Sequence, residues 1–144
     1  MKIKNYKLTA FSGEIGPKLK EGDRQIPEGI YKITFLNPNS SYHLSMKINY
    51  PNDFDRRMGN NDGREFLGSD IMIHGMNVTI GCIPVGNPGI EELFVLANNA
   101  GIDNTIVVIA PKDFRKDPSY PQIKTISWVN VLYDNLNSEL TKYH

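Results

Sequence analysis

Residues 70–85 read DIMIHGMNVTIGCIPV, and this stretch holds the only cysteine of the 144-residue chain, Cys82, and one of its three histidines, His74. An apolar run over 71–73 leads into His74, Gly75 interrupts it, and a second apolar run follows Cys82. Short apolar runs bounded by turn residues are typical of buried strands. The stretch therefore predicts two short strands, with the histidine ending the first and the cysteine beginning the second, so that their side chains can meet.

The cysteine and the histidine permit two interpretations. A thiol becomes a nucleophile when an imidazole takes its proton, whereas a lone cysteine is most often a small buried hydrophobe. Glycine favours the first interpretation, because Gly75 directly follows the histidine and Gly81 directly precedes the cysteine. Glycine weakens strands, so at these positions it indicates tight backbone geometry or close approach of a ligand.

The order of these residues resembles the catalytic motif of the YkuD-type L,D-transpeptidases, which is His-Gly, a variable insert and Ser/Thr-x-Gly-Cys. The matching residues are His74-Gly75 and Thr79-Ile80-Gly81-Cys82. Other stretches resemble the N-terminal signature of the family and its YafK-like branch: 12–18 (SGEIGPK), 21–23 (EGD), 27–31 (PEGIY), 50–52 (YPN) and 55–56 (DR). The resemblance spans residues 11–96, and the combination is far more specific than any single motif.

The resemblance implies acyl transfer through a thioester on the stem peptide of peptidoglycan, at an L,D or D,L bond around diaminopimelate. Cys82 would attack a peptide carbonyl, and His74 would accept the thiol proton and return it to the leaving amine. We therefore expect His74 to lower the pKa of the Cys82 thiol. The Gly75 carbonyl would orient His74 by accepting its other ring N–H, and no cofactor or metal is expected.

The substrate site is expected to use backbone and side-chain groups near this pair. Backbone N–H groups around Thr79, Ile80 and Gly81 would hold the oxyanion of the tetrahedral intermediate. Two features depart from the wider family: Ile80 stands where most members carry a second histidine, and Pro84 stands where many carry arginine. Both features, with the short insert, are shared by the YafK-like branch. The sequence leaves open whether an amine or water resolves the acyl-enzyme, and hence whether the activity is transpeptidase, carboxypeptidase or amidase.

Two basic residues outside the motif are candidate substrate contacts. Lys18 lies in a predicted charged loop over 12–27 and could face an anionic substrate; the alternative is a solvated loop. Arg56 lies in a second predicted loop over 51–69, which we interpret as a lid or wall of the site because long loops are often functional. Arg56 could anchor substrate or pair with Asp55.

The fold expected is a β-rich α+β domain, a YkuD-like mixed β-sheet sandwich or barrel formed by residues 1–144 as a single catalytic domain. The resemblance implies further N-terminal strands that this chain could lack. One helix is expected after the cysteine strand, with Asn87 as N-cap and Gly101 as its end, and another within 123–143. The predicted strands are 2–11, 30–36, 42–50, 71–73, 83–85 and 104–110.

Composition restricts the partners. The net charge is zero, so no basic stripe supports nucleic-acid binding, and no apolar run approaches a membrane span. The N-terminus is too polar for a signal-peptide core. The resemblance nevertheless implies an enzyme of the periplasm or cell envelope acting on peptidoglycan stem peptides or on a wall-linked protein. A secreted effector that attacks a competitor's wall is the alternative location.

Two other functions, which do not depend on the YkuD resemblance, also fit the residues. A zinc protein could use His43, His74 and Cys82, although the chain offers no fourth convincing ligand. A non-catalytic wall-binding domain would make Cys82 structural. A reactive thiol at neutral pH would count against that second reading.

Overall fold

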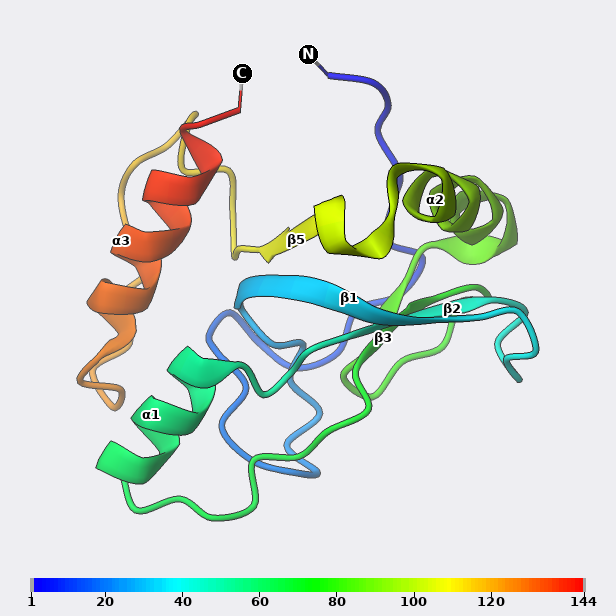
Figure 1. Ribbon diagram of the computed structural model, residues 1–144. Helices are drawn as coiled ribbons and strands as arrows, with labels where there is room; N and C mark the ends of the chain where they lie inside the picture. Colours follow the sequence, from blue (N-terminus) through cyan, green and yellow to red (C-terminus); the bar gives the residue numbers. More distant parts are fainter. Residues whose placement is uncertain (1, 144) are drawn as a thin grey trace.

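The structure is a computed structural model that describes residues 2–143; Met1 and His144, the ends of the predicted domain, lie outside the described residues. Within residues 2–143 the chain forms a five-stranded sheet, three α-helices and one short 3-10 helix (Figure 1). The strands are β1 (Gly29–Asn37), β2 (Ser45–Ile48), β3 (Met72–His74), β4 (Ile83–Pro84) and β5 (Ile106–Ile109). The helices are α1 (Asp53–Asn61), α2 (Gly86–Ala100), α3 (Val129–Leu140) and the 3-10 helix η1 (Ile102–Asn104).

The sheet is mixed, which confirms the predicted fold class. Its strand order is β4-β3-β2-β1-β5, and every pair is antiparallel except β3 and β4, which run parallel. In the parallel pair Ile73 lies opposite Ile83, and His74 lies opposite Pro84. The two apolar runs of the 70–85 stretch are therefore adjacent strands, as the sequence predicts.

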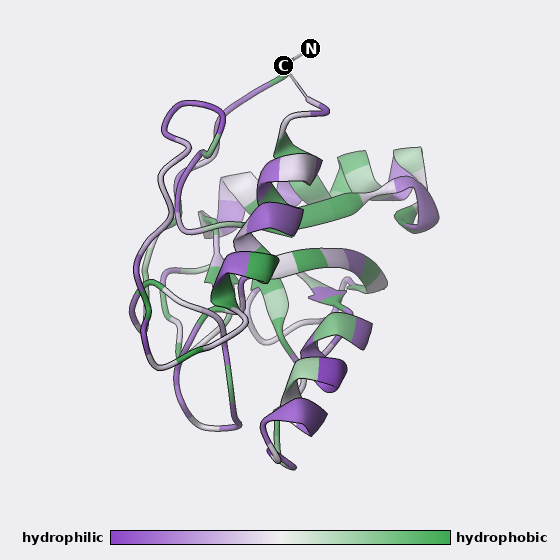
Figure 2. Cartoon of the chain, turned by 90° about the vertical axis from the view of Figure 1, so that its left-hand side faces the viewer, coloured by the Kyte–Doolittle hydropathy of each residue, from purple (hydrophilic) through white to green (hydrophobic). Residues whose placement is uncertain are grey.

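Two hydrophobic clusters hold the helices to this sheet. The first joins α2 to the sheet through residues such as Tyr31, Ile48 and Ile90, all with 0% exposure. The second joins α3 to β1, β5 and α1, around Phe114 and Tyr133. In Figure 1, α1 and α3 lie at one end of the sheet and α2 at the other. Figure 2 shows hydrophobic residues concentrated in the strands and hydrophilic residues along the connecting segments.

Several predicted elements agree with the structure. The strand predicted over 30–36 lies within β1, and the helix predicted within 123–143 is α3. Gly101 ends α2 as expected, and that helix packs on the sheet through its apolar stripe, namely Ile90, Leu93, Phe94 and Ala97. The strand predicted over 104–110 is shortened to β5, which is partly exposed because it forms an edge of the sheet.

The N-terminal strand prediction is wrong. Residues 2–11 form no strand, and one backbone hydrogen bond, from Thr9 N to Pro84 O at 3.0 Å, joins this segment to β4. Leu8 and Phe11 remain 50% and 62% exposed, so the loose alternation of apolar residues has no buried face to occupy. Alternation predicts a strand only where a neighbouring strand pairs with it along its length.

The loop predicted over 51–69 contains a helix. Asn52 caps α1, accepting a hydrogen bond from Asp55 N at 2.8 Å, while the Asp55 carboxylate accepts from Asn52 N at 3.0 Å. This reciprocal pair is a capping box, and it explains why a polar, glycine-containing segment is helical.

Two other boundaries differ from prediction. The strand predicted over 42–50 is reduced to β2, because His43 adopts a left-handed conformation (φ 76°) that no strand continues through. Helix α2 begins at Gly86 after Val85, and Asn87 is not its N-cap. The Asn87 side chain instead accepts a hydrogen bond from Met76 N at 2.9 Å.

Candidate active site

His74 ends β3 in the interior of the sheet and is only 2% exposed. Its Nδ1 atom lies 2.5 Å from the carbonyl oxygen of Gly75. Because a carbonyl can only accept, Nδ1 carries the proton, and this bond assigns the tautomer. The basic nitrogen left over is Nε2, which can accept a proton from a neighbouring acid.

The packing around Gly75 explains why glycine follows the histidine. Its N–H approaches the carbonyl oxygens of Tyr42 and Leu44 at 3.1 and 3.2 Å. A Cβ atom at this position would lie 2.6 Å from the Tyr42 oxygen and 2.7 Å from Oδ1 of Asn87. A side chain here would displace the backbone that presents the carbonyl to His74.

An aromatic ring that sequence reasoning missed also holds the imidazole. The rings of Tyr42 and His74 have centroids 4.7 Å apart, inclined by 39°. Tyr42 precedes β2, so it reaches His74 only through the pairing of β2 with β3. Its place in an aromatic-rich alternating segment is the only local signal that could have drawn attention to it.

Cys82 directly precedes β4 and is partly buried. Extending the parallel register back by one residue places Cys82 opposite Met72, so that Cys82 and His74 share a face of the sheet, one diagonal step apart. The thiol points to the carbonyl oxygen of Asp70, with an Sγ–O distance of 3.7 Å. Among residues 2–143, no hydrogen bond joins Cys82 to His74 in this conformation.

The expectation of a lowered thiol pKa is wrong for this conformation. Burial raises the pKa of Cys82 above its ordinary value, and the Asp70 carboxylate acts in the same direction. A hydrogen bond with the Met72 backbone and the charge of Lys18 lower the pKa, but they do not outweigh burial. The physical reason is that burial disfavours the thiolate and no hydrogen bond to the imidazole offsets it among the described residues.

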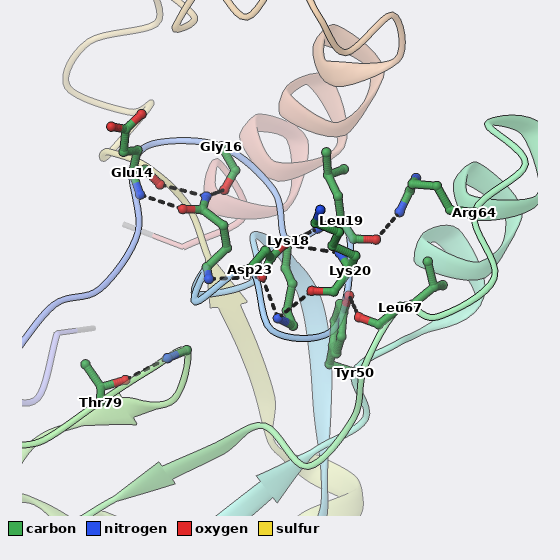
Figure 3. A network of polar contacts seen from close by, with 12 residues as sticks. Glu14, Gly16, Lys18, Leu19, Lys20, Asp23, Tyr50, Arg64, Leu67 and Thr79 are labelled. Carbon is green, nitrogen blue, oxygen red and sulfur yellow. Dashed lines mark hydrogen bonds and ion pairs between the residues drawn. The ribbon is translucent and has the colours of Figure 1, made fainter.

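The residues before Cys82 form a closed turn. The hydroxyl of Thr79 donates to the Cys82 carbonyl oxygen at 2.5 Å. The same hydroxyl accepts a hydrogen bond from Gly81 N at 3.0 Å (Figure 3). Gly81 has φ 133°, and a Cβ there would lie 3.2 Å from the carbonyl oxygen of Gln25. The Gly81 N–H is thus engaged by Thr79 in this conformation, while the Ile80 side chain is 76% exposed beside the cysteine.

Lys18 is an internal cation rather than a free surface charge. Its side chain is 5% exposed, and its Nζ lies 2.6 Å from Oδ1 of Asp23 and 3.0 Å from the carbonyl oxygen of Lys20 (Figure 3). Asp23 also accepts backbone hydrogen bonds, among them one from Leu19 N. Although burial opposes them, the Lys18 bond and the backbone bonds together hold the pKa of the Asp23 carboxyl below its usual value.

Arg56 lies on α1 with its side chain 59% exposed, 3.4 Å from Asp53. The alternative pairing with Asp55 is not formed, because Asp55 is buried and accepts from the Tyr31 hydroxyl at 2.9 Å. Arg56 lines an open pocket of about 600 Å³ whose lining also includes Ser69, the residue before the one whose carbonyl meets the thiol.

The three candidate zinc ligands are not brought together. Nε2 of His43 lies 2.7 Å from the Glu91 carboxylate, and Nδ1 of His74 is bound to the Gly75 carbonyl. In the part of the chain that the structure describes, no group of three or more His, Cys, Asp or Glu side chains is arranged to hold a metal ion. Over the same residues, no helix has the length and apolar character needed to cross a membrane.

The sheet, with its histidine and cysteine on adjacent parallel strands, defines the class of protein. A family model described as the YkuD L,D-transpeptidase catalytic domain matches residues 2–109. The chain therefore belongs to the YkuD family.

Curated relatives agree with this assignment. Over 100 residues the chain is 38% identical to proteins named "Putative L,D-transpeptidase YafK" from Escherichia coli K12 and from Escherichia coli O157:H7. The aligned region is 68% of this chain and 38% of each relative. The chain thus spans less than half the length of the curated relatives it matches.

Solved structures share the fold. A mutant of the helical cell shape determining protein Pgp2 from Campylobacter jejuni superposes with a TM-score of 0.55 and 23% identity, covering 92% of this chain and 44% of that one. A second structure of Pgp2 gives a TM-score of 0.52 and 18% identity, covering 93% of this chain and 59% of that one. At these identities the likeness concerns the fold alone.

Proposed function

We propose that residues 1–144 form a single catalytic domain that performs cysteine-dependent acyl transfer on peptidoglycan stem peptides in the periplasm or cell envelope. The observation that carries this proposal is the bond from His74 Nδ1 to the Gly75 carbonyl. It leaves Nε2 as the basic nitrogen on the face of the sheet that also holds Cys82. Family membership and the names of the E. coli relatives supply the substrate class.

The first step is attack by the sulfur on a carbonyl carbon of the stem peptide. Since burial raises the pKa of Cys82, the resting thiol keeps its proton until His74 takes it during attack. The thiol must first turn from the Asp70 carbonyl toward the imidazole. Nε2 then holds the proton, and a C–S bond forms as the carbonyl oxygen becomes an oxyanion.

Backbone N–H groups around the cysteine receive that oxyanion in our proposal. Because Gly81 N–H donates to Thr79, the Ile80 and Cys82 N–H groups are our candidates for the oxyanion hole. Collapse of the intermediate breaks the C–N bond, and the leaving amine takes the proton from His74. The thioester is then resolved by water or by an amine. The likeness to YafK, with Ile80 and Pro84 in place of the groups common elsewhere in the family, leads us to favour water, or release of a wall-linked protein.

Two basic residues act around this centre in our proposal. Arg56 anchors an anionic part of the substrate in the pocket that it lines together with Ser69. Lys18, which is internal and paired with Asp23, acts on the charge of Cys82 rather than by touching substrate.

The test is incubation of the purified protein with disaccharide-tetrapeptide, cross-linked and protein-linked muropeptides, with products identified by mass spectrometry. Loss of terminal D-Ala with addition of water defines a carboxypeptidase. A new cross-link or an exchanged D-amino acid defines a transpeptidase, and release of a peptide from diaminopimelate defines an amidase. Each activity should fall by orders of magnitude in Cys82→Ala. Activity retained in that variant, or no altered muropeptide with a reactive thiol, would refute the murein assignment.

A further inference from the structure

A serine on the strand next to the histidine has no role in the scheme above. Ser45 begins β2 and is the register partner of His74 on β3. The flanking backbone hydrogen bond, from Gly75 N to Leu44 O at 3.2 Å, identifies this as a non-hydrogen-bonded antiparallel pair. Side chains of such a pair lie on the same face and closer together than those of a hydrogen-bonded pair. The Ser45 side chain therefore lies beside the imidazole.

The Ser45 hydroxyl is also unsatisfied. Ser45 is 1% exposed, and within residues 2–143 its Oγ has no hydrogen-bond partner. Buried polar groups almost always have a partner, because a desolvated hydroxyl without one is unfavourable. Alanine would fill this position without that cost, so the hydroxyl needs an explanation other than stability.

The histidine supplies that explanation. In the resting state Nδ1–H is shared with nothing but the Gly75 carbonyl, and the Tyr42 ring packs on the imidazole. When His74 takes the thiol proton, both ring nitrogens become donors and the ring gains a positive charge. The oxygen of a serine that is the register partner of His74 on the neighbouring strand can then accept a share of Nδ1–H together with Gly75, because the positive charge strengthens the hydrogen bonds that the ring donates.

We propose that Ser45 is a positioning residue for His74, whose hydroxyl accepts a hydrogen bond from the imidazolium Nδ1–H while His74 carries the cysteine proton. This inference rests on the proposed function and deepens it.

Several ionisable groups surround His74: Tyr42 against the ring, Cys82 and the Lys47–Asp70 pair on the same face, Lys18 near Cys82, and the His43–Glu91 pair beyond Gly75. Unlike these groups, Ser45 is both paired in register with His74 and without a hydrogen-bond partner among the described residues.

The test uses two readouts that need no murein substrate. The first is single-turnover acylation of Cys82 by p-nitrophenyl acetate at neutral pH. The second is the rate at which the Nδ1–H of the imidazolium form of His74 exchanges with water, measured by NMR at acid pH. In Ser45→Ala we expect acylation to slow by on the order of tenfold to a hundredfold, and Nδ1–H exchange to accelerate. Ser45→Thr, which keeps the hydroxyl, should restore most of the rate.

The control is Ser12→Ala. The Ser12 hydroxyl is likewise buried and without a partner among the described residues, but it lies in the N-terminal segment. Both alanine variants should melt at or above the parent temperature, and Ser12→Ala should acylate at the parent rate. In a His74→Ala background, Ser45→Ala should have no further effect, because the serine acts through the histidine.

The outcomes separate this inference from the function on which it rests. Parent acylation and exchange rates in Ser45→Ala would overturn it, as would a loss of rate that persists without His74. If Ser45→Ala does not fold, Ser45→Thr becomes the test. Acylation of Ser45→Thr as slow as that of His74→Ala would then overturn the inference. An absence of muropeptide products from the parent protein, with these rates as expected, would refute the substrate and leave the role of Ser45 intact.

Discussion

The hydroxyl of Tyr31 on β1 donates to the carboxylate of Asp55 on α1 at 2.9 Å, and both side chains are buried. The same carboxylate completes the capping box of α1 with Asn52. One buried acid therefore joins the sheet to the helix that flanks the Arg56 pocket. Burial raises the pKa of Asp55 to about 6, although its hydrogen bonds and two nearby arginines oppose this.

This raised pKa predicts a pH-dependent stability. The folded protein binds the Asp55 proton more tightly than the unfolded chain, whose pKa is near the ordinary 3.8. The contribution of Asp55 to the free energy of unfolding should therefore be present in full below pH 4, fall as pH rises to about 6, and be lost above it. The difference corresponds to ~3 kcal/mol. Buried Glu28, whose pKa is also raised, contributes in the same direction. Urea denaturation across this pH range measures the slope.

Asp55→Asn should reduce that slope while leaving an amide oxygen to accept one hydrogen bond. Asp53→Asn, at an exposed carboxylate in the same turn, is the matched control and should leave the slope as it is. An equal slope in the parent and in Asp55→Asn would show that Asp55 does not titrate in this range.

A second prediction concerns the glycine after the histidine. Gly75→Ala should destabilise the protein by about 1–3 kcal/mol, since its Cβ would overlap Tyr42 O and Asn87 Oδ1. The same displacement should move the carbonyl that orients His74, so acylation of Cys82 should fall as well. Urea midpoints and p-nitrophenyl acetate kinetics provide the two measurements.

Gly63→Ala is the control for backbone strain alone. Gly63 has φ 69° with nothing within 4 Å of a Cβ, so its loss should cost about 1–2 kcal/mol and leave acylation unchanged. Parent kinetics in Gly75→Ala would mean that the carbonyl does not orient the imidazole.

The parts of the site that are close in sequence could be predicted. His74, Gly75 and Cys82 lie within one stretch, and two β-branched runs with glycines between them suffice to indicate adjacent strands. Tyr42 and Ser45 could not be predicted in the same way. They reach His74 through the β2–β3 register, which pairs residues 29 positions apart.

The predicted element boundaries were wrong where local composition favours one structure and tertiary contacts favour another. The segment over 51–69 has the composition of a loop, and only the Asn52/Asp55 capping box marks the helix inside it. The N-terminal segment alternates like a strand but finds no partner along its length, so it stays irregular. Capping residues deserve more weight than composition in a segment of this kind.

A third prediction concerns Arg56. Because its side chain is 59% exposed and its partner Asp53 is fully exposed, Arg56→Ala should change stability by no more than about 0.5 kcal/mol. If Arg56 anchors substrate in the pocket that it lines together with Ser69, the same variant should raise KM for muropeptides. Arg57→Ala, on the same helix, removes an equal charge that does not line this pocket. A large loss of stability, or equal KM values in the two variants, would assign Arg56 no role in binding.

The last prediction concerns the ionisation of the nucleophile. Since burial raises the pKa of Cys82, its alkylation by iodoacetamide should have a midpoint above pH 9.0. Asp70→Asn should move that midpoint to lower pH, because the Asp70 carboxylate disfavours the thiolate. Lys18→Met should move it to higher pH, but that variant also leaves Asp23 nearly buried without its cation and should be destabilised. The control is Asp113→Asn. The Asp113 carboxylate is paired with Arg115, and its loss should leave the midpoint in place. A parent midpoint below pH 7 would mean that the thiolate and the imidazolium form an ion pair before substrate arrives, and attack would then need no proton transfer to His74.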